Sequence, residues 1–558
     1  MGGKMMGNGN TLGTVRDSGT DAGIGRPEAS RSGMWRWDWV RLLILLVLVC
    51  AAGCASSRNA KDGCQSAKDD IANQERFIAF YAIQEKDWAE VLATAEEVLR
   101  LDPDHAEAKQ WEWVALLGPL PEEIDRGLKY KVLQGRAVVT GLGPGVVKVL
   151  SLPSALNEKP VVRVGYRAFR RCSSLRSVTI PDSVTSIGIQ AFEQCTALRS
   201  VTIPDGVTSI GFQAFMECTA LTSATIPDSV TSIGIQAFSG CRALTSVTIP
   251  DSVTNIADWA FSRCRALTSV TIPDSVTNIG DWAFSFCEAL TSVAIPDGVT
   301  SVGVAAFAGC NALTSVAIPS SVTNIGDRAF MECGALTSVT IPSSVTNIGS
   351  EAFNDCPKLA GILVDQENPS YVSADGVLFT RDMKELVQYP SGRETGVYAI
   401  PDSVTSIGVG AFSLCEALTS VIIPDSVTNI GDGAFEGCEA LTSVTIPDSV
   451  TSIGEIAFAS CRKLTSVTIS DGVTSIGDMA FMECEALTSV TIPDSVTNIG
   501  DWAFMECEAL TSVTIPDSVT SIGDRAFEGC LRLRMVVLPK GVKLGKQVFK
   551  KCPWQPGK

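Results

Sequence analysis

The sequence predicts an α+β chain in which a long solenoid of short parallel strands follows a signal peptide and a small helical segment. Three observations predict this fold. Sixteen of the 19 cysteines belong to one series with a 23-residue period. About a dozen other positions recur with them, and apolar residues at helical spacing stand before the first copy. Such a period is typical of a chain that stacks one small structural unit many times.

Composition narrows the classes of function. The chain has 558 residues, of which 45% are hydrophobic and 19% charged, as expected of a folded protein. Its formal net charge of −17 argues against a nucleic-acid partner, because phosphate binding needs a basic face. His105 is the single histidine, which disfavours acid–base catalysis or metal binding by imidazole groups. We therefore expect a protein that is not an enzyme, with no cofactor and no metal site.

Residues 1–53 form the predicted signal region, with Met34 as a candidate true start. Arg36 and Arg41 precede an apolar run at 42–52. This run has the length of a signal peptide and is too short to span a bilayer comfortably as a helix.

Cys54 follows the small residues that end this run. Basic flank, apolar core, small residues and Cys stand in an order that resembles the bacterial lipobox. The resemblance implies that Cys54 is lipidated at the mature N-terminus, and Ala55 after it implies an outer-membrane destination. A plain secretory signal or a membrane anchor is the alternative. Residues 54–64 are a predicted linker ending at Cys64, a free or an intermolecular thiol.

Residues 65–118 are a predicted helical spacer. Apolar side chains recur at helical spacing at Trp88, Val91, Leu92, Ala95, Val98 and Leu99. Asp87 can cap this helix and Pro103 can end it. Asp87-Trp88, Leu92, Leu99 and Leu101-Asp102-Pro103 resemble one tetratricopeptide unit. A single unit cannot form the peptide groove of such repeats, which favours a stalk or cap over a peptide-binding domain.

The repeats occupy most of the remaining chain. Residues 119–145 are a predicted N-terminal capping hairpin, 146–552 the solenoid and 553–558 a tail. Each copy has the form LTSVTIPDSVTSIGxxAFxxCxx. Its first six residues follow L-x-x-V-x-I, which matches the core of leucine-rich repeats. The apolar side chains are expected to point into the coil and the intervening Ser and Thr to point out of the strand.

The full pattern, A-F-x-x-C-x-x-L-x-x-V-x-I-P-x-x-V-x-x-I-G, resembles the BspA-like leucine-rich repeat family of bacterial surface proteins over about residues 128–552. This resemblance implies a solenoid at the cell surface that binds other proteins or host matrix. Between Cys356 and Cys415 the spacing is 59, or two periods plus 13. A hairpin insertion at about 365–395, with GVLFT and ELVQYP as strands, accounts for the excess and looks like the insertion of that family.

The cysteine series invites a disulfide or metal interpretation, which geometry disfavours. Equivalent Cys residues on neighbouring turns would have parallel Cβ vectors about 4.8 Å apart. A disulfide needs converging Cβ atoms about 3.8 Å apart, and a metal needs ligands aimed at one point. We therefore expect free, buried thiols that pack as small hydrophobes.

Variation between copies concentrates after Ile-Gly and before Cys, and it supplies the candidate binding residues. Trp259 and Trp282 are 23 residues apart and should stack on adjacent turns, with Phe286 nearby and Trp502 repeating the motif alone. Such aromatic residues can hold a sugar ring or a partner side chain, or simply cover the flank of the coil. In one copy the positions expected to be free to differ are Asp281, Trp282, Ser285 and Phe286.

These features predict a non-enzymatic, lipid-anchored protein of the bacterial cell envelope, at the outer membrane or cell surface. Its predicted function is protein–protein interaction or adhesion through the solenoid, with a protein or extracellular-matrix partner. A structural envelope scaffold without a specific ligand and a glycan-binding surface protein are the alternatives. The sequence contains no Gly-rich phosphate loop, no His-bearing triad and no nucleophile elbow.

Overall fold

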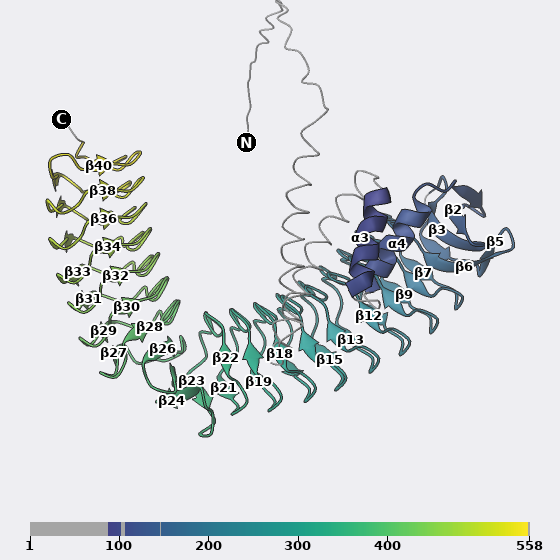
Figure 1. The fold of residues 1–558 in the computed structure, drawn as a ribbon, viewed down its shortest axis with the longest axis horizontal. Helices are drawn as coiled ribbons and strands as arrows, with labels where there is room; N and C mark the ends of the chain where they lie inside the picture. Colours follow the sequence, from purple (N-terminus) through teal and green to yellow (C-terminus); the bar gives the residue numbers. More distant parts are fainter. Residues whose placement is uncertain (1–87, 102–105, 146, 556–558) are drawn as a thin grey trace, which may run out of the picture. The chain divides into compact units, whose positions relative to one another are not determined.

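The computed structural model describes residues 88–101, 106–145 and 147–555, which form a coil of stacked turns and two helices (Figure 1). The predicted signal region with Met34, the linker with Cys54 and Cys64, and His105 lie outside the described residues. Within the described ranges, neither helix has the length and apolar character needed to cross a membrane.

The two helices are α3 (Trp88–Leu101) and α4 (Ala106–Leu117). Val91, Ala95 and Val98 are buried at helical spacing on α3, and they share one apolar cluster with Trp111 of α4 and Ile189 of the solenoid. The helices therefore dock on the early turns through apolar burial. Their likeness to a tetratricopeptide unit stays a prediction.

A small antiparallel sheet precedes the regular turns. It contains β1 (Glu123–Asp125), β2 (Leu128–Leu133) and β3 (Arg136–Leu142). Gln134 and Gly135 link β2 to β3 with φ angles of 51° and 74°, as a tight hairpin turn requires. β3 then pairs in parallel with β6 (Lys159–Val164), so this hairpin is the first layer of the coil. The first turn also holds β4 (Val149–Ser151) and β5 (Ala155–Leu156).

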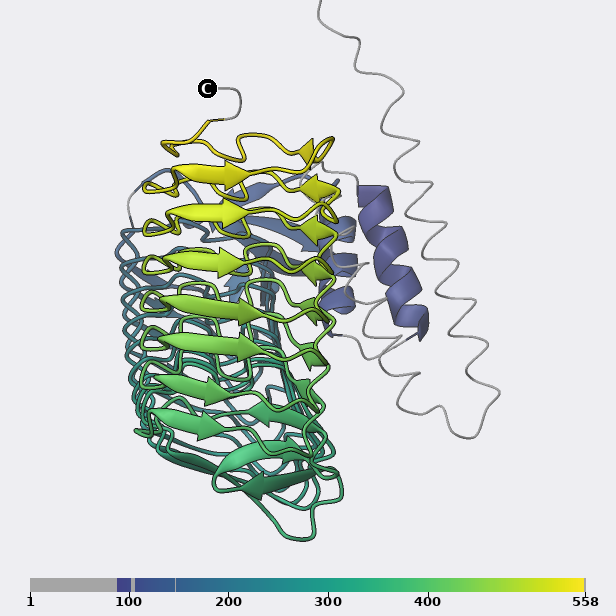
Figure 2. The same ribbon diagram turned by 90° about the vertical axis from the view of Figure 1, so that its left-hand side faces the viewer.

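Each regular turn contributes one longer and one shorter strand (Figure 2). The longer strands before the insertion are β7 (Ser177–Thr179), β9 (Ser200–Thr202), β11 (Ser223–Thr225), β13 (Ser246–Thr248), β15 (Ser269–Thr271), β17 (Ser292–Ala294), β19 (Ser315–Ala317), β21 (Ser338–Ile341) and β23 (Gly361–Val364). Those after it are β27 (Val397–Ala399), β29 (Ser420–Ile422), β31 (Ser443–Ile446), β33 (Ser466–Ile469), β35 (Ser489–Thr491), β37 (Ser512–Thr514) and β39 (Met535–Val537).

The shorter strands form a second series in the same turns. Before the insertion they are β8 (Ser186–Ile187), β10 (Ser209–Ile210), β12 (Ser232–Ile233), β14 (Asn255–Ile256), β16 (Asn278–Ile279), β18 (Ser301–Val302), β20 (Asn324–Ile325) and β22 (Asn347–Ile348). After it they are β28 (Ser406–Ile407), β30 (Asn429–Ile430), β32 (Ser452–Ile453), β34 (Ser475–Ile476), β36 (Asn498–Ile499), β38 (Ser521–Ile522) and β40 (Lys543–Leu544).

Neighbouring turns pair in parallel, each residue with its own copy one period later. Ser200, Val201 and Thr202 of β9, for example, lie opposite Ser223, Ala224 and Thr225 of β11. A slip of one residue would turn every buried Val outward, so the alternating burial holds this register. The predicted solenoid of 23-residue repeats with short parallel strands is confirmed.

A column of phenylalanine rings runs through the core. Phe192 and Phe215 stack with ring centroids 5.2 Å apart and an interplanar angle of 1°, and the same contact repeats from turn to turn. Both rings are fully buried. The coil is thus closed on its far side by identical side chains that stack because the turns stack.

The cysteines line this core as free thiols, as expected. Fifteen of the 16 in the described chain are buried, and none forms a disulfide. The buried thiols also form hydrogen bonds that the sequence did not indicate. The Sγ of Cys264 donates a hydrogen bond to the carbonyl oxygen of Phe238, one turn back, at 3.3 Å. Burial raises the pKa of Cys264 to about 12, so the thiol stays protonated and able to donate.

The insertion contains β24 (Tyr371–Ala374), β25 (Val377–Thr380) and β26 (Glu385–Gln388), paired in antiparallel fashion. β26 then pairs in parallel with β28, and Tyr389 stacks on Phe412, 23 residues later, at 5.0 Å. The chain therefore rejoins the coil at β26, where the paired residues are 21 apart, and the spacing of 23 returns at Tyr389. The expected tail is described to residue 555, and its Trp554 packs edge-on against Phe549 of the last turn at 4.7 Å.

Candidate binding surface on the solenoid flank

The variable positions lie on one side of the coil, which we call the variable flank. It comprises the residues of each turn between the short strand and the cysteine, such as 281–286. Two residues per turn have a left-handed backbone there, and the four candidate binding residues are among them: Trp259 (φ 58°), Trp282 (φ 57°), Phe286 (φ 56°) and Trp502 (φ 54°).

Backbone hydrogen bonds between turns hold the left-handed residues of the variable flank. The N–H of Trp282 donates to the carbonyl of Val304 at 2.8 Å, and that of Phe286 to the carbonyl of Ala308 at 2.6 Å. A non-glycine residue in this conformation costs roughly 1–2 kcal/mol, which the inter-turn ladder offsets. Because only backbone atoms make these bonds, the side chains can change from turn to turn.

Trp259 and Trp282 stack on adjacent turns, as expected from their spacing. Their ring centroids are 4.8 Å apart and their planes differ by 8°. Both side chains are half-buried, so each indole keeps part of its surface in solvent. A stacked pair of this kind is worth about 0.5–1.5 kcal/mol beyond its buried area.

The tryptophan pair continues a column of contacts along the flank. In the preceding turns, Gln190 donates to Gln213 and Gln213 to Gln236, each at 2.5 Å. In the turns beyond the tryptophans, Arg328 pairs with Glu351 at 2.5 Å. The same backbone position thus presents amides, then aromatic rings, then an ion pair along one line.

Phe286 covers the next turn. An ideal Cβ atom on Gly309 would lie 2.5 Å from Cδ1 of Phe286, so the ring rests against a glycine that leaves room for it. Phe286 is half-buried as a result. This contact indicates that the ring of Phe286 covers the next turn of the coil, whether or not it also binds a partner.

Asp281 and Ser285 vary between copies, as expected, and in this copy they also form contacts between turns. A carboxylate oxygen of Asp281 accepts a hydrogen bond from the N–H of Val304 at 2.7 Å. Ser285 is fully buried, and its hydroxyl lies 2.8 Å from the hydroxyl of Ser262. Both side chains therefore tie neighbouring turns together, which the variation between copies concealed.

Trp502 stands apart from the other three candidates. It lies in the core segment that follows the insertion, and no ring contact to it occurs among the described residues. Met479 and Arg525 occupy its column in the turns before and after. The structure therefore brings together one aromatic pair and leaves Trp502 single.

The strand face is polar apart from several exposed apolar residues that sequence reasoning missed. Ser and Thr of the longer strands are exposed around a buried Val in most turns. Val397 and Ile422 beside the insertion and Met535 and Val537 in the last turn are 57–67% exposed where other turns carry Ser or Thr. Aligning the copies position by position would have found them. Within the described ranges, no group of three or more His, Cys, Asp or Glu residues is arranged to hold a metal.

The family model for the BspA type leucine rich repeat region matches residues 151–267, 233–360, 396–485 and 429–555, which together cover more than half of the chain. The chain belongs to the BspA-type leucine-rich repeat family. Members of this family are bacterial cell-surface repeat proteins, and their solenoid fits a protein-interaction scaffold. Nothing in the family match or the fold indicates catalysis.

The chain is similar to solved structures of leucine-rich repeat proteins. A leucine-rich repeat protein from Eubacterium ventriosum is 22% identical, with a TM-score of 0.50, covering 78% of this chain and 96% of its own. A leucine rich cell surface protein from Faecalibacterium prausnitzii is 32% identical, with a TM-score of 0.45, covering 75% and 94%. A leucine-rich repeat protein from Bacteroides ovatus is 29% identical, with a TM-score of 0.43, covering 75% and 95%. No curated protein sequence matches the chain.

Proposed function

We propose that the chain is a surface-exposed adhesion or interaction protein of a bacterial cell envelope, whose solenoid binds a protein partner through the variable flank. One observation carries this proposal. The core, the strand register and the inter-turn hydrogen bonds repeat from turn to turn, whereas the flank changes from amides to aromatic rings to an ion pair. A rigid frame that presents a varied surface is suited to recognition.

The geometry of the tryptophan pair favours a protein partner over a glycan. Trp259 and Trp282 face each other at 4.8 Å, so a sugar ring cannot enter between them. The pair instead offers edges and outer faces beside the amide of Gln236 in the preceding turn. Partly buried aromatic residues next to polar groups are typical of the residues that dominate protein–protein binding energy.

The membrane attachment is part of the same proposal. We infer that Cys54 carries a lipid that anchors the chain at the outer membrane or cell surface, because basic, apolar and small residues precede it in order. Cells grown with labelled palmitate should yield a labelled chain. A Cys54→Ser chain that keeps the label would contradict the anchor.

Binding is tested on immobilised protein with extracellular proteins as analytes and a polysaccharide array in parallel. We expect Trp259→Ala with Trp282→Ala to weaken binding of the captured protein at least about tenfold. The control is Gln190→Ala with Gln213→Ala, which removes a side-chain pair from the same column and leaves both the rings and Gln236 in place. Equal loss in both double variants would argue against the aromatic pair, and array binding alone would favour the glycan alternative.

A further inference from the structure

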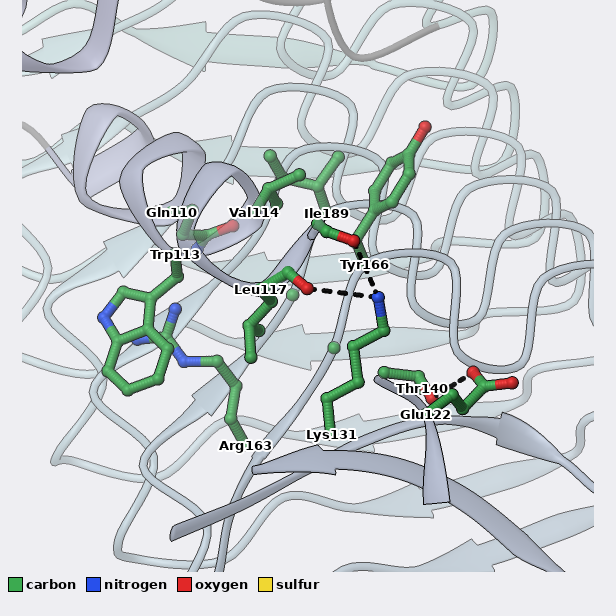
Figure 3. A pocket seen from close by; sticks show the side chains of 13 residues that line it. Gln110, Trp113, Val114, Leu117, Glu122, Lys131, Thr140, Arg163, Tyr166 and Ile189 are labelled. Carbon is green, nitrogen blue, oxygen red and sulfur yellow. Dashed lines mark hydrogen bonds between the residues drawn. The ribbon is translucent and has the colours of Figure 1, made fainter. Parts of the chain in front are cut away.

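A cavity of about 220 Å³ lies between α4 and the first turns of the coil (Figure 3). Trp113, Val114 and Leu117 of α4 form one wall, and Lys131 of β2, Arg163 of β6 and Ile189 line the others. The cavity therefore joins three parts of the chain that the repeat pattern does not relate. Its solenoid wall belongs to the variable flank of the early turns, because Ile189 lies between β8 and Cys195, and it is remote in sequence from the tryptophan pair on which the proposed function rests.

Arg163 differs from the other charged residues of this cavity in its interactions. Its guanidinium lies over the ring of Trp113, with Cζ 4.3 Å from the ring centroid. Among the described residues it forms no ion pair, and Glu112 acts on it only from a longer distance. Burial lowers the pKa of Arg163 to about 10, so the group is still a cation at neutral pH.

The other charges of the cavity already have partners. The ammonium of Lys131 donates to the carbonyls of Leu117 and Gly118, at 3.1 and 3.0 Å, where α4 ends (Figure 3). The carboxylate of Glu122 accepts from the hydroxyl of Thr140 at 2.7 Å and pairs with Lys129 at 3.1 Å. Neither group therefore neutralises Arg163.

A second polar group in the cavity wall lacks a partner. Gln110 is 4% exposed, and its Oε1 accepts no hydrogen bond within the described part of the chain. A buried carbonyl oxygen without a donor costs roughly 1–3 kcal/mol. A ligand that supplies an N–H group to Gln110 and an anion to Arg163 would remove both deficits.

We propose that this cavity binds a small carboxylate with an apolar body and an amide or amine N–H. The carboxylate pairs with Arg163, since a guanidinium fork matches two carboxylate oxygens. The apolar body lies against Val114, Leu117 and Ile189. The N–H donates to Gln110 after its side-chain amide rotates into the cavity, because Oε1 now lies against Gly211. A dry cavity of about 150 Å³ already accepts a benzene ring, so this volume holds one ring and its substituents.

The test is calorimetric titration of the whole chain with two probes that differ in one charge. N-acetylphenylalanine carries the carboxylate, the N–H and the ring, and N-acetylphenylalaninamide replaces the carboxylate with a neutral amide. We expect saturable binding of the acid and binding of the amide at least about tenfold weaker, because a charge-assisted bond is lost. Inorganic phosphate is titrated alone, and we expect it to bind more weakly than the acid because it has no apolar body.

Two variants place the binding in the cavity. Arg163→Met keeps an unbranched apolar stem, removes the guanidinium group and should abolish the preference for the acid over the amide. Arg136→Met removes an exposed charge on β3, outside the cavity wall, and should leave the preference intact. Circular dichroism verifies that both variants fold. The comparison of the two probes on the unmodified chain tests the proposal even if Arg163→Met does not fold. No binding of the acid, equal binding of the two probes, or tighter binding of phosphate than of the acid would overturn the proposal.

Discussion

Fourteen of the 15 buried cysteines in the described chain donate a hydrogen bond to the carbonyl of the phenylalanine one turn back. The contact recurs at 3.0–3.4 Å in nearly every turn, for instance from Cys241 to Phe215 and from Cys507 to Phe481. A thiol is a weak donor on a small apolar side chain, which suits a position that must be both packed and satisfied. This explains why the position carries Cys rather than Ala or Ser.

Ionisation of these thiols predicts a loss of stability at alkaline pH. The folded-state pKa of Cys264 is raised by burial from 9.0 to about 12. Its stabilising contribution is therefore present below pH 9 and is lost as the pH rises toward 12, because only the unfolded chain releases the proton. Across that window, the free energy of unfolding should fall by about 1.4 kcal/mol per pH unit for this thiol.

Cys264→Ala isolates that effect. Near pH 7 the variant should be less stable by about 1–2 kcal/mol, through a lost buried sulfur and hydrogen bond. The deficit should shrink as the pH rises above 9 and reverse sign by about pH 11, since the variant has no such thiol to ionise. Urea unfolding under reducing conditions from pH 7 to pH 11 measures it, and a deficit that does not change with pH would refute the buried-thiol explanation.

The close contact between Gly309 and Phe286 predicts that a side chain at position 309 destabilises the variable flank. Gly309→Ala should destabilise the chain by about 2–3 kcal/mol, because the residue has a φ of 73° and the new Cβ would meet Phe286 at 2.5 Å. Gly433→Ala is the matched control, with a φ of 58° and its nearest atoms at 3.5 Å, and should lose only about 1 kcal/mol. Thermal unfolding compares the two. Combining Gly309→Ala with Phe286→Ala should recover the extra loss of stability. A double-mutant cycle with no coupling energy between the two substitutions would show that the ring does not rest on Gly309.

At the scale of elements, the insertion is a degenerate turn with an added hairpin. Leu386 pairs with Ile407 and Tyr389 stacks on Phe412, as in regular turns. Gly392 stands 23 residues before Cys415, where a regular turn has cysteine. An ideal Cβ on Gly392 would lie 2.5 Å from the backbone nitrogen of Leu359, so the returning chain leaves no space for a side chain.

Restoring a side chain at this position should therefore harm the fold. We expect Gly392→Ala to destabilise the chain by about 1–3 kcal/mol, since backbone atoms must move. Gly334→Ala serves as the comparison, because its new Cβ would meet nothing closer than 3.6 Å. Denaturant unfolding of both variants measures the difference, and a Gly392→Ala chain as stable as Gly334→Ala would show that the turn can yield.

For the whole molecule, stability should be close to a sum over turns. Each turn pairs with its neighbours through residues exactly one period apart, as Ser246 does with Ser269. Repeat arrays of this kind gain stability from each unit and each interface between units. The insertion separates two core clusters of the coil, which meet around Val377 and Leu378.

Deleting one whole period tests this view. Removal of residues 219–241 should leave a folded chain with the same circular dichroism per residue and a smaller denaturant dependence of unfolding. Removal of residues 219–230 breaks the register and should unfold the turns around the deletion. Similar circular dichroism spectra of the two deletion variants would contradict a coil whose stability depends on the register between turns.

Periodicity explains which features the sequence could predict. A contact between copies, such as the stack of Trp259 on Trp282, follows directly from a spacing of 23. The hairpin at Gln134-Gly135 carries its own local signal. The pairing of Arg163 with Trp113 has neither, because it joins a helix to a strand across 50 residues without a repeat. The contact of Asp281 could not be predicted for another reason, since it depends on the direction in which its carboxylate points.

The binding role of the variable flank is tested most directly by hydrogen–deuterium exchange on the chain with and without the protein partner captured by it. We expect the partner to slow exchange in peptides covering residues 258–263 and 281–286 on the flank, and to leave the strand-face peptides of β13 and β15 unchanged. Slower exchange confined to the strand face, with the flank unaffected, would contradict recognition through the variable flank.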